Sequence, residues 1–133
     1  MIVEDHPPTL AALNALIATA LPNCQLVAAE SGELAIELCA KHAPHIVVMD
    51  IALPGVDGIE ATRRIKSLLP DTRVVMHSSH DIQIYREGST AAGASAFVTK
   101  ARTFSDLVPA ITSLLPPAAP GSDGGRQSPM TNN

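Results

Sequence analysis

The chain has 133 residues, a length that suits one compact domain. Hydrophobic residues make up 46% of the chain but aromatic residues only 2%, so its core has to be built from Leu, Ile, Val and Ala. The formal net charge is -4 and the chain has no basic run, which argues against nucleic-acid binding by this chain alone, because phosphate contacts need clustered Lys and Arg.

The first half of the chain predicts three strands that alternate with two helices. The opening run "MIV" indicates a buried strand of about three residues, and a helical spacing of apolar residues follows over 8–21. A second strand is expected over 24–30, then a helix that Ser31 caps and Pro44 terminates. The run "HIVVMD" predicts a third strand, and its continuous apolar character is typical of a strand buried on both faces.

The second half of the chain predicts two further strands and three helices. The strands are expected at 72–79 and 95–100, and the helices at 59–69, at 81–93 and from 103 onwards. In the helix over 59–69, Leu68 is expected to face the core. Thr103 is expected to cap the last helix, with Asp106 three residues later as its capping-box partner. Residues 116–133 are rich in Pro, Gly and Ser and are predicted to be a disordered tail after a domain over 1–115.

Alternation of five strands with five helices predicts an α/β fold, a doubly wound parallel sheet with helices on both faces. In such folds ligands bind at the carboxyl ends of the strands. The polar residues expected at those ends are Glu4, Asp5, Asp50, Ser78, Ser79 and Lys100. Because all parallel strands point the same way, these side chains are expected to meet at one edge of the sheet.

The chemistry of these residue types indicates a magnesium and phosphate site. Clustered carboxylates repel one another unless a cation lies among them, and oxygen ligands without His or Cys favour Mg²⁺. Lys100 is a point charge suited to a phosphate oxygen, and a Ser hydroxyl can donate to another. The carboxylate of Asp50 could itself attack phosphorus and form an aspartyl phosphate.

Four stretches of the sequence resemble the receiver domain of two-component response regulators: "VEDHP", "VVMDIALPGVDGIEATRRIK", "VVMHSSHD" and "GASAFVTK". They cover roughly residues 1–115 in the order and spacing of that family, and the sequences of these motifs are most similar to those of the NarL/LuxR-type branch. The resemblance implies a flavodoxin-like sheet with strand order 2-1-3-4-5. It also implies a switch that a sensor histidine kinase turns on by phosphorylation.

The resemblance assigns roles to the residues at the strand ends. Asp50 would accept the phosphoryl group, and Mg²⁺ would be held by Glu4, Asp5, Asp50 and the backbone carbonyl of Ala52. Lys100 would pair with the phosphoryl group.

Two further residues match the moving parts of such a switch. Ser78 matches the hydroxyl residue that moves to bind the phosphoryl group, and Phe97 matches the aromatic residue that swings inward with it. The surface of the fourth helix, fifth strand and fifth helix would then change. Family members often carry Pro after the lysine, where this chain has Ala101. Pairing into a homodimer on phosphorylation would also fit the family.

Two other functions stay open at this point. Aspartyl phosphatases of the haloacid-dehalogenase type carry a second acid two residues after the nucleophile, a position that Ala52 occupies here, so little turnover is expected and the chain is not predicted to be an enzyme. Regulators of the NarL/LuxR type usually continue into a DNA-binding domain, so the chain could also be the receiver part of a transcriptional regulator.

The cysteines, the hydropathy and the short first strand give the last expectations, on the cellular compartment and on the start of the chain. Cys24 and Cys39 form no C-x-x-C pair, which favours two reduced thiols in a cytoplasmic protein. No apolar run approaches the roughly 20 residues of a membrane span. Receivers usually bring more residues to the first strand than "MIV", so a misplaced start or a fragment is expected, with reduced stability.

Overall fold

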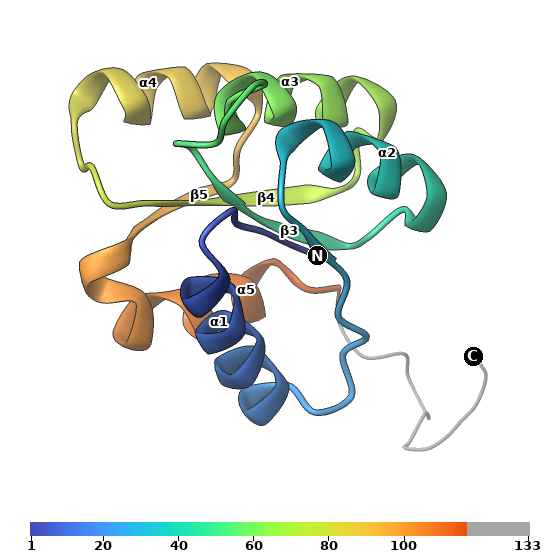
Figure 1. The fold of residues 1–133 in the computed structure, drawn as a ribbon, viewed down its shortest axis with the longest axis vertical. Helices are drawn as coiled ribbons and strands as arrows, with labels where there is room; N and C mark the ends of the chain where they lie inside the picture. The colour runs from blue at the N-terminus through green and yellow to red at the C-terminus, as the bar shows by residue number, and fades with distance from the viewer. Residues whose placement is uncertain (117–133) are drawn as a thin grey trace.

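A computed structural model describes residues 1–116, and the predicted tail from residue 117 onwards lies outside the described residues. Five parallel strands form one sheet in the order β2-β1-β3-β4-β5, as predicted (Figure 1). The strands are β1 (Ile2–Val3), β2 (Ala28–Ala29), β3 (Ile46–Asp50), β4 (Arg73–Ser78) and β5 (Ala96–Thr99).

The helices cover both faces of the sheet, with α2, α3 and α4 on one face and α1 and α5 on the other (Figure 1). The α-helices are α1 (Pro7–Ala20), α2 (Gly32–His42), α3 (Gly58–Leu68), α4 (Gln83–Ala92) and α5 (Val108–Leu114). A 3₁₀ turn over Lys100–Arg102 and a π-helical turn over Thr103–Leu107 lead into α5. Within residues 1–116, no helix has both the length and the apolar character that a membrane crossing would need.

The core forms two apolar layers because successive side chains of a strand point to opposite faces. Val47 and Met49 of β3 pack into the layer beneath α2 and α3, whereas Val48 packs into the layer beneath α1 and α5. All five residues of β3 are buried, as the apolar run predicts. Each fully buried Val, Ile or Met contributes about 1.5–3 kcal/mol, so these two layers supply most of the stability.

Local signals set several helix ends, and the cap at Ser31 is the one expected from the sequence. The Ser31 hydroxyl accepts a hydrogen bond from Leu34 N at 3.1 Å and caps α2. Asp57 caps α3 in the same way, since its carboxylate accepts from Glu60 N at 2.9 Å. Gly93 closes α4 with φ of 103°, the left-handed backbone that favours glycine.

Three expectations are corrected by the structure. Leu68 does not face the core, because its side chain is 55% exposed at the end of α3. Thr103 does not cap the last helix: its hydroxyl donates to the carbonyl of Lys100, and Asp106 pairs with Arg102 instead. The strand expected over 24–30 pairs only at Ala28–Ala29, because β1 offers just two residues to pair with.

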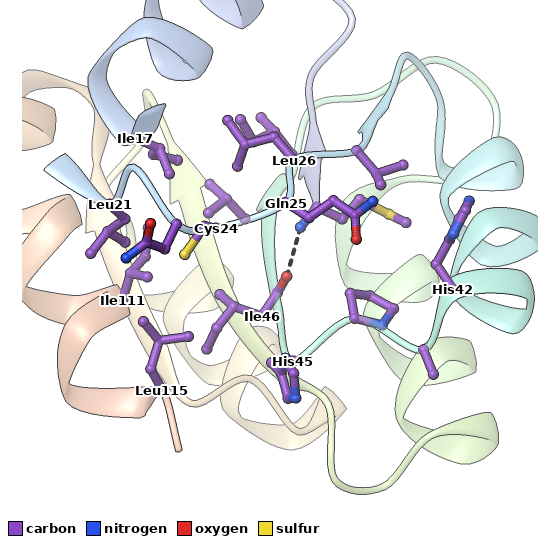
Figure 2. Close-up of a pocket in the computed structure, with 17 residues that line it drawn as sticks. Ile17, Leu21, Cys24, Gln25, Leu26, His42, His45, Ile46, Ile111 and Leu115 are labelled. Atoms are coloured by element: carbon purple, nitrogen blue, oxygen red, sulfur yellow. Dashed lines mark hydrogen bonds between the residues drawn. The ribbon is translucent and has the colours of Figure 1, made fainter. Parts of the chain in front are cut away.

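A cavity of about 390 Å³ lies at the end of the sheet where β3 begins, opposite the end where Asp50 lies. Apolar side chains of α1, α5 and the lead into β2 surround it (Figure 2), among them Leu21, Leu26, Ile111 and Leu115. The amino group of Met1 lies on its wall and donates to the carbonyl of Ile46 at 2.8 Å, the dashed line of Figure 2. Burial lowers the pKa of this amino group, because the charged form is poorly solvated there.

Three apolar residues added ahead of Met1 are expected to raise the free energy of unfolding by about 1–2 kcal/mol. The extension would continue β1 beside Leu26 and Ile46, fill apolar space in the cavity and replace a buried ammonium group by an amide. Urea unfolding of the extended and original chains measures the gain. A matched extension of Gly and Ser residues is the control, because it also replaces the buried ammonium group of Met1 by an amide but adds no apolar side chains. Equal stability of the two extended chains would show that the apolar contacts contribute nothing.

Candidate functional site

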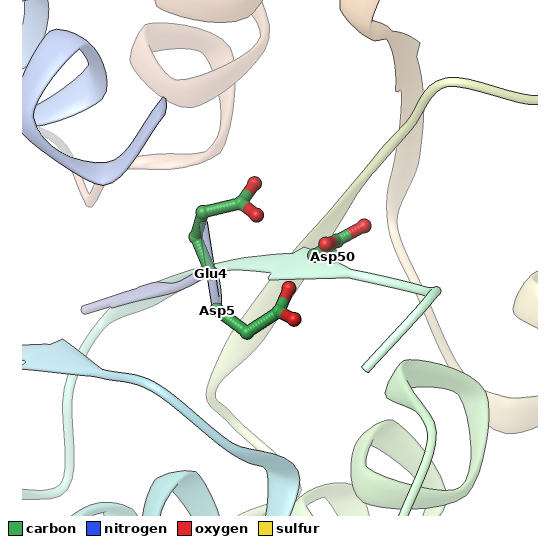
Figure 3. A group of neighbouring side chains, drawn as sticks. All are labelled: Glu4, Asp5 and Asp50. Atoms are coloured by element: carbon green, nitrogen blue, oxygen red, sulfur yellow. The ribbon is translucent and has the colours of Figure 1, made fainter. Parts of the chain in front are cut away.

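Three carboxylates meet at the carboxyl edge of the sheet. Glu4 and Asp5 follow β1 directly, and Asp50 is the last residue of β3. One ligand oxygen from each of the three side chains lies within 4.8 Å of the others. Figure 3 shows Glu4 and Asp5 extending from the end of β1 toward Asp50. The structure therefore brings together the three acids that the sequence places at neighbouring strand ends.

Lys100 joins this group from the turn that follows β5. Its ammonium nitrogen lies 2.9 Å from Glu4 Oε1 and 3.4 Å from Asp50 Oδ2. The other oxygen of Glu4 accepts a hydrogen bond from His6 N at 3.2 Å. Glu4 is thus buried and held on both oxygens, whereas Asp5 is exposed to solvent.

Burial and mutual repulsion split the pKa values of the two buried acids. Burial raises the pKa of Asp50 to about 6, the charge of Glu4 adds to this, and Lys100 opposes it. Burial also acts to raise the pKa of Glu4, but hydrogen bonds from Lys100 and the His6 amide outweigh it, so that pKa is lowered. Of the two, Asp50 is therefore the acid whose negative charge is not fully offset by hydrogen bonds and by Lys100.

The charges of the cluster fit a hard divalent cation. Three ionised carboxylates and one ammonium group leave two negative charges at the edge of the sheet. All three acids offer oxygen ligands, which suit Mg²⁺, and the exposure of Asp5 leaves room for the waters that Mg²⁺ retains. The Ala52 amide donates to Asp50 Oδ1 at 3.3 Å, so the backbone predicted to supply a further ligand lies beside the Asp50 carboxylate.

Gly58 packs the start of α3 directly against the backbone that carries Asp50. Its amide donates to the carbonyl of Ile51 at 2.9 Å. A Cβ atom added at Gly58 would lie 1.9 Å from the carbonyl oxygen of Asp50, far inside contact distance. The sequence shows this glycine only as part of a breaker-rich loop, so its role in positioning Asp50 is visible only in the structure.

Ser78 is the buried last residue of β4, whereas its neighbour Ser79 is exposed. The Ser78 hydroxyl accepts a hydrogen bond from His80 N at 3.1 Å and lies 3.3 Å from the His80 carbonyl, to which it donates. The loop after β4 is therefore tied to the hydroxyl that the resemblance identifies as the moving one.

Phe97 lies in β5 and is partly buried. The guanidinium group of Arg86 lies 4.6 Å from the centre of its ring, and the same Arg86 pairs with Asp81 in the loop after β4. In that region His80 also meets Tyr85 edge to face, with ring centres 6.2 Å apart. Contacts from α4 thus connect the loop that follows Ser78 with the ring predicted to switch.

Together, the fold and the site define a flavodoxin-like α/β domain with an acidic centre suited to a divalent cation. The comparisons agree with this class. The family model described as "Response regulator receiver domain" matches residues 1–112. The chain therefore belongs to the receiver domain family of two-component response regulators. Receiver domains generally bind Mg²⁺ at an acidic pocket, and this chain has an acidic cluster of Glu4, Asp5 and Asp50 at the carboxyl edge of its sheet.

Similar proteins are LuxR- and NarL-type response regulators. The transcriptional activator protein ExaE of Pseudomonas putida is 33% identical over 116 residues, which cover 86% of this chain and 54% of that protein. The transcriptional regulatory protein DegU of Brevibacillus brevis is 34% identical over 112 residues, with coverage of 84% and 47%. The chain spans about half the length of these curated relatives.

The fold is also that of solved receivers. A two-component response regulator of the LuxR family from Aurantimonas sp. SI85-9A1 superimposes with a TM-score of 0.80 and 37% identity, covering 85% of this chain and 81% of that one.

Proposed function

We propose that this receiver is a phosphorylation-activated switch in which Asp50 accepts a phosphoryl group from the phosphohistidine of a sensor kinase. The observation that carries the proposal is the position of Asp50. Its carboxylate is buried at the carboxyl edge of the sheet, 3.4 Å from the Lys100 ammonium nitrogen and within 4.8 Å of the acids of β1. Glu4 is the other buried carboxylate of this cluster within residues 1–116, but both of its oxygens are already engaged, one by Lys100 and the other by the His6 amide.

The transfer needs a nucleophile, charge neutralisation and a leaving group. A carboxylate oxygen of Asp50 would attack phosphorus as the bond between phosphorus and the kinase imidazole breaks, and the imidazole nitrogen keeps the electron pair. Glu4, Asp5, Asp50 and the Ala52 carbonyl would hold Mg²⁺, which when bound neutralises the charge of the phosphoryl oxygens. Lys100 would move from Glu4 and Asp50 toward the transferred group, because the phosphoryl group carries more negative charge than either of the two carboxylates that Lys100 contacts here.

The response would then pass to the surface of α4, β5 and α5. The Ser78 hydroxyl would leave His80 and donate to the phosphoryl group, which would draw in the loop after β4. Phe97 would move inward and lose its contact with Arg86. Such a local change of charge biases a surface that has two arrangements. A histidine kinase is the implied partner, and a homodimer formed on phosphorylation is a further part of this proposal.

A second candidate function is supported by the names and lengths of the relatives. ExaE and DegU are named as transcriptional proteins, and the chain covers 54% and 47% of them. The receiver could therefore act as the regulatory part of a DNA-binding regulator. DNA contact would then come from a further domain, because this chain has a net charge of -4.

Replacement of Asp50 by Asn tests the proposal. The wild-type chain, given labelled acetyl phosphate and Mg²⁺, is expected to take up label, and Asp50→Asn is expected to take up none, because the amide is not a nucleophile for phosphorus. Asp71→Asn is the matched control and should label like the wild type, because Asp71 is an exposed acid just before β4, at the opposite edge of the sheet from Asp50. Undiminished labelling of Asp50→Asn would show that another residue is the acceptor. Sustained phosphate release from a small phosphomonoester would instead favour a phosphatase.

A further inference from the structure

His77 is a buried polar residue that the proposed transfer does not use. It precedes Ser78 in β4 and is 2% exposed. Because side chains alternate along a strand, His77 faces the layer of α1 and α5, whereas Ser78 faces the opposite layer. His77, Lys100 and Thr103 line the same groove of about 340 Å³ beside α1. Most buried polar side chains are hydrogen-bonded, so the partner of the His77 ring indicates its role.

The direction of the hydrogen bonds is fixed by the single proton of the Thr103 hydroxyl. That hydroxyl donates to the carbonyl of Lys100 at 2.8 Å. It also lies 2.8 Å from His77 Nε2, and since its proton is already given to Lys100, the ring nitrogen must be the donor. His77 is therefore the tautomer with a proton on Nε2. Burial and the nearby charge of Lys100 lower the pKa of His77 to about 4, which keeps the ring neutral at physiological pH.

These bonds act where the sheet no longer restrains the chain. The pairing of β4 with β5 ends at Ser78 and Thr99, one residue before Lys100. The Lys100 carbonyl accepts both the backbone N–H and the hydroxyl of Thr103, so this turn is held at its first residue. Through Thr103, His77 fixes that turn to the end of β4, and the Lys100 side chain extends from the fixed turn to Glu4 and Asp50.

We propose that His77 and Thr103 are positioning residues that hold Lys100 at the acidic site and tie it to the strand end that carries Ser78. The inference rests on the proposed function, since it concerns the lysine that would pair with the phosphoryl group. It assigns the link a role beyond stability: loss of the link moves Lys100 while the fold persists. The hydrogen bonds of the two side chains run to each other and to the Lys100 carbonyl rather than to a carboxylate of the site, so we expect both residues to act through Lys100.

The pair Thr103→Val and Thr103→Ser tests the link, because valine has the shape of threonine without the hydroxyl and serine keeps the hydroxyl. Thr103→Val is expected to slow labelling of Asp50 by acetyl phosphate by about ten-fold, since small misplacements of a positioned group cost up to about 10²-fold. Thr103→Ser should stay within about two-fold of the wild type. His77→Leu and His77→Gln form a second pair. His77→Leu should slow the labelling of Asp50 because leucine has no donor for the Thr103 hydroxyl, whereas His77→Gln keeps a donor and should label close to the wild-type rate.

A double-mutant cycle separates positioning from stability. In a Lys100→Ala background, Thr103→Val should have no further effect on the labelling rate, because the link acts through the lysine. An equal slowing in both backgrounds would overturn the proposal. The proposal would also be overturned if Thr103→Val lowered the melting temperature but left the labelling rate per folded molecule unchanged, because the link would then contribute only to stability.

Two further measurements do not depend on Asp50 being the phosphoacceptor. Nitrogen NMR of His77 should show a proton on Nε2, and a proton on Nδ1 alone would overturn the link. Crystal structures of Thr103→Val and Thr103→Ser should show the contact of 2.9 Å between Lys100 Nζ and Glu4 Oε1 lost in the first and kept in the second. If the wild type takes no label, the proposed function fails, and these two results still decide whether the link positions Lys100.

Discussion

Replacement of Gly58 by Ala is expected to lower the free energy of unfolding by at least about 3 kcal/mol. The added Cβ would lie 1.9 Å from the Asp50 carbonyl oxygen and 2.8 Å from the Ile51 Cα atom. Both are backbone atoms, so no side-chain rotation can relieve the clash. The start of α3 would have to move away from the end of β3, and the Asp50 carboxylate would move with its backbone.

Gly88→Ala in α4 is the matched control, because its Cβ would meet only the end of the Ile59 side chain, at 3.2 Å. Alanine is favoured over glycine inside a helix by about 1 kcal/mol, so this variant should remain within about 1 kcal/mol of the wild type. Urea unfolding of both variants measures the difference. If Gly58→Ala is as stable as Gly88→Ala, the close packing of α3 on β3 does not restrict position 58.

Replacement of Asp50 by Asn is expected to stabilise the metal-free protein at pH 7 by about 2–3 kcal/mol. The pKa of Asp50 is raised from its ordinary 3.8 to about 6 in the folded state. A raised carboxyl pKa means that the folded state holds a proton that the unfolded state has lost, so this contribution is present at low pH and is lost as the pH rises through about 6. At pH 7 the ionised Asp50 therefore opposes folding, and the neutral amide would not.

The pH window separates Asp50 from Glu4. The lowered pKa of Glu4 gives stability that is present above its ordinary value of 4.5 and is lost only below it. Between pH 5 and pH 7 the stability of the wild type in chelator should therefore fall by about 1 kcal/mol relative to that of Asp50→Asn. The comparison between the two proteins is needed because His77, with its lowered pKa, contributes a slope of the opposite sign to both. Asp71→Asn should keep the wild-type slope.

Added Mg²⁺ should restore the stability of the wild type at pH 7 and leave Asp50→Asn less affected, because a ligand of the folded state stabilises it in proportion to its affinity. Equal slopes for the wild type and Asp50→Asn in chelator would show that Asp50 carries no uncompensated charge.

The alternation of strands and helices and the meeting of the acids could be predicted because they depend on features within each segment, whereas the strand order is implied by the family resemblance. The run "HIVVMD" is apolar enough to predict a strand buried on both faces, and parallel strands bring Glu4, Asp5 and Asp50 to one edge. The roles of these acids remain a prediction, since neighbouring positions alone do not show which carboxylate is phosphorylated.

What the sequence could not show depends on partners remote in the chain. Thr103 has the local pattern of a helix cap, yet its hydroxyl donates to the Lys100 carbonyl and also contacts His77, a partner 26 residues away that the sequence does not reveal. The strand expected over 24–30 has the right composition, but a strand needs a partner, and β1 offers only Ile2 and Val3. Gly58 looks like an ordinary turn glycine until the backbone of Asp50 is placed against it.

The edge-to-face contact of Tyr85 with His80 has a practical consequence for spectroscopy. The chain contains one tyrosine and no tryptophan, so its intrinsic ultraviolet fluorescence comes essentially from a single position. That position lies in α4, against the loop whose backbone is bound to the Ser78 hydroxyl. A movement of this loop changes the surroundings of the only fluorophore. The unmodified protein thus carries its own optical reporter at the segment proposed to move.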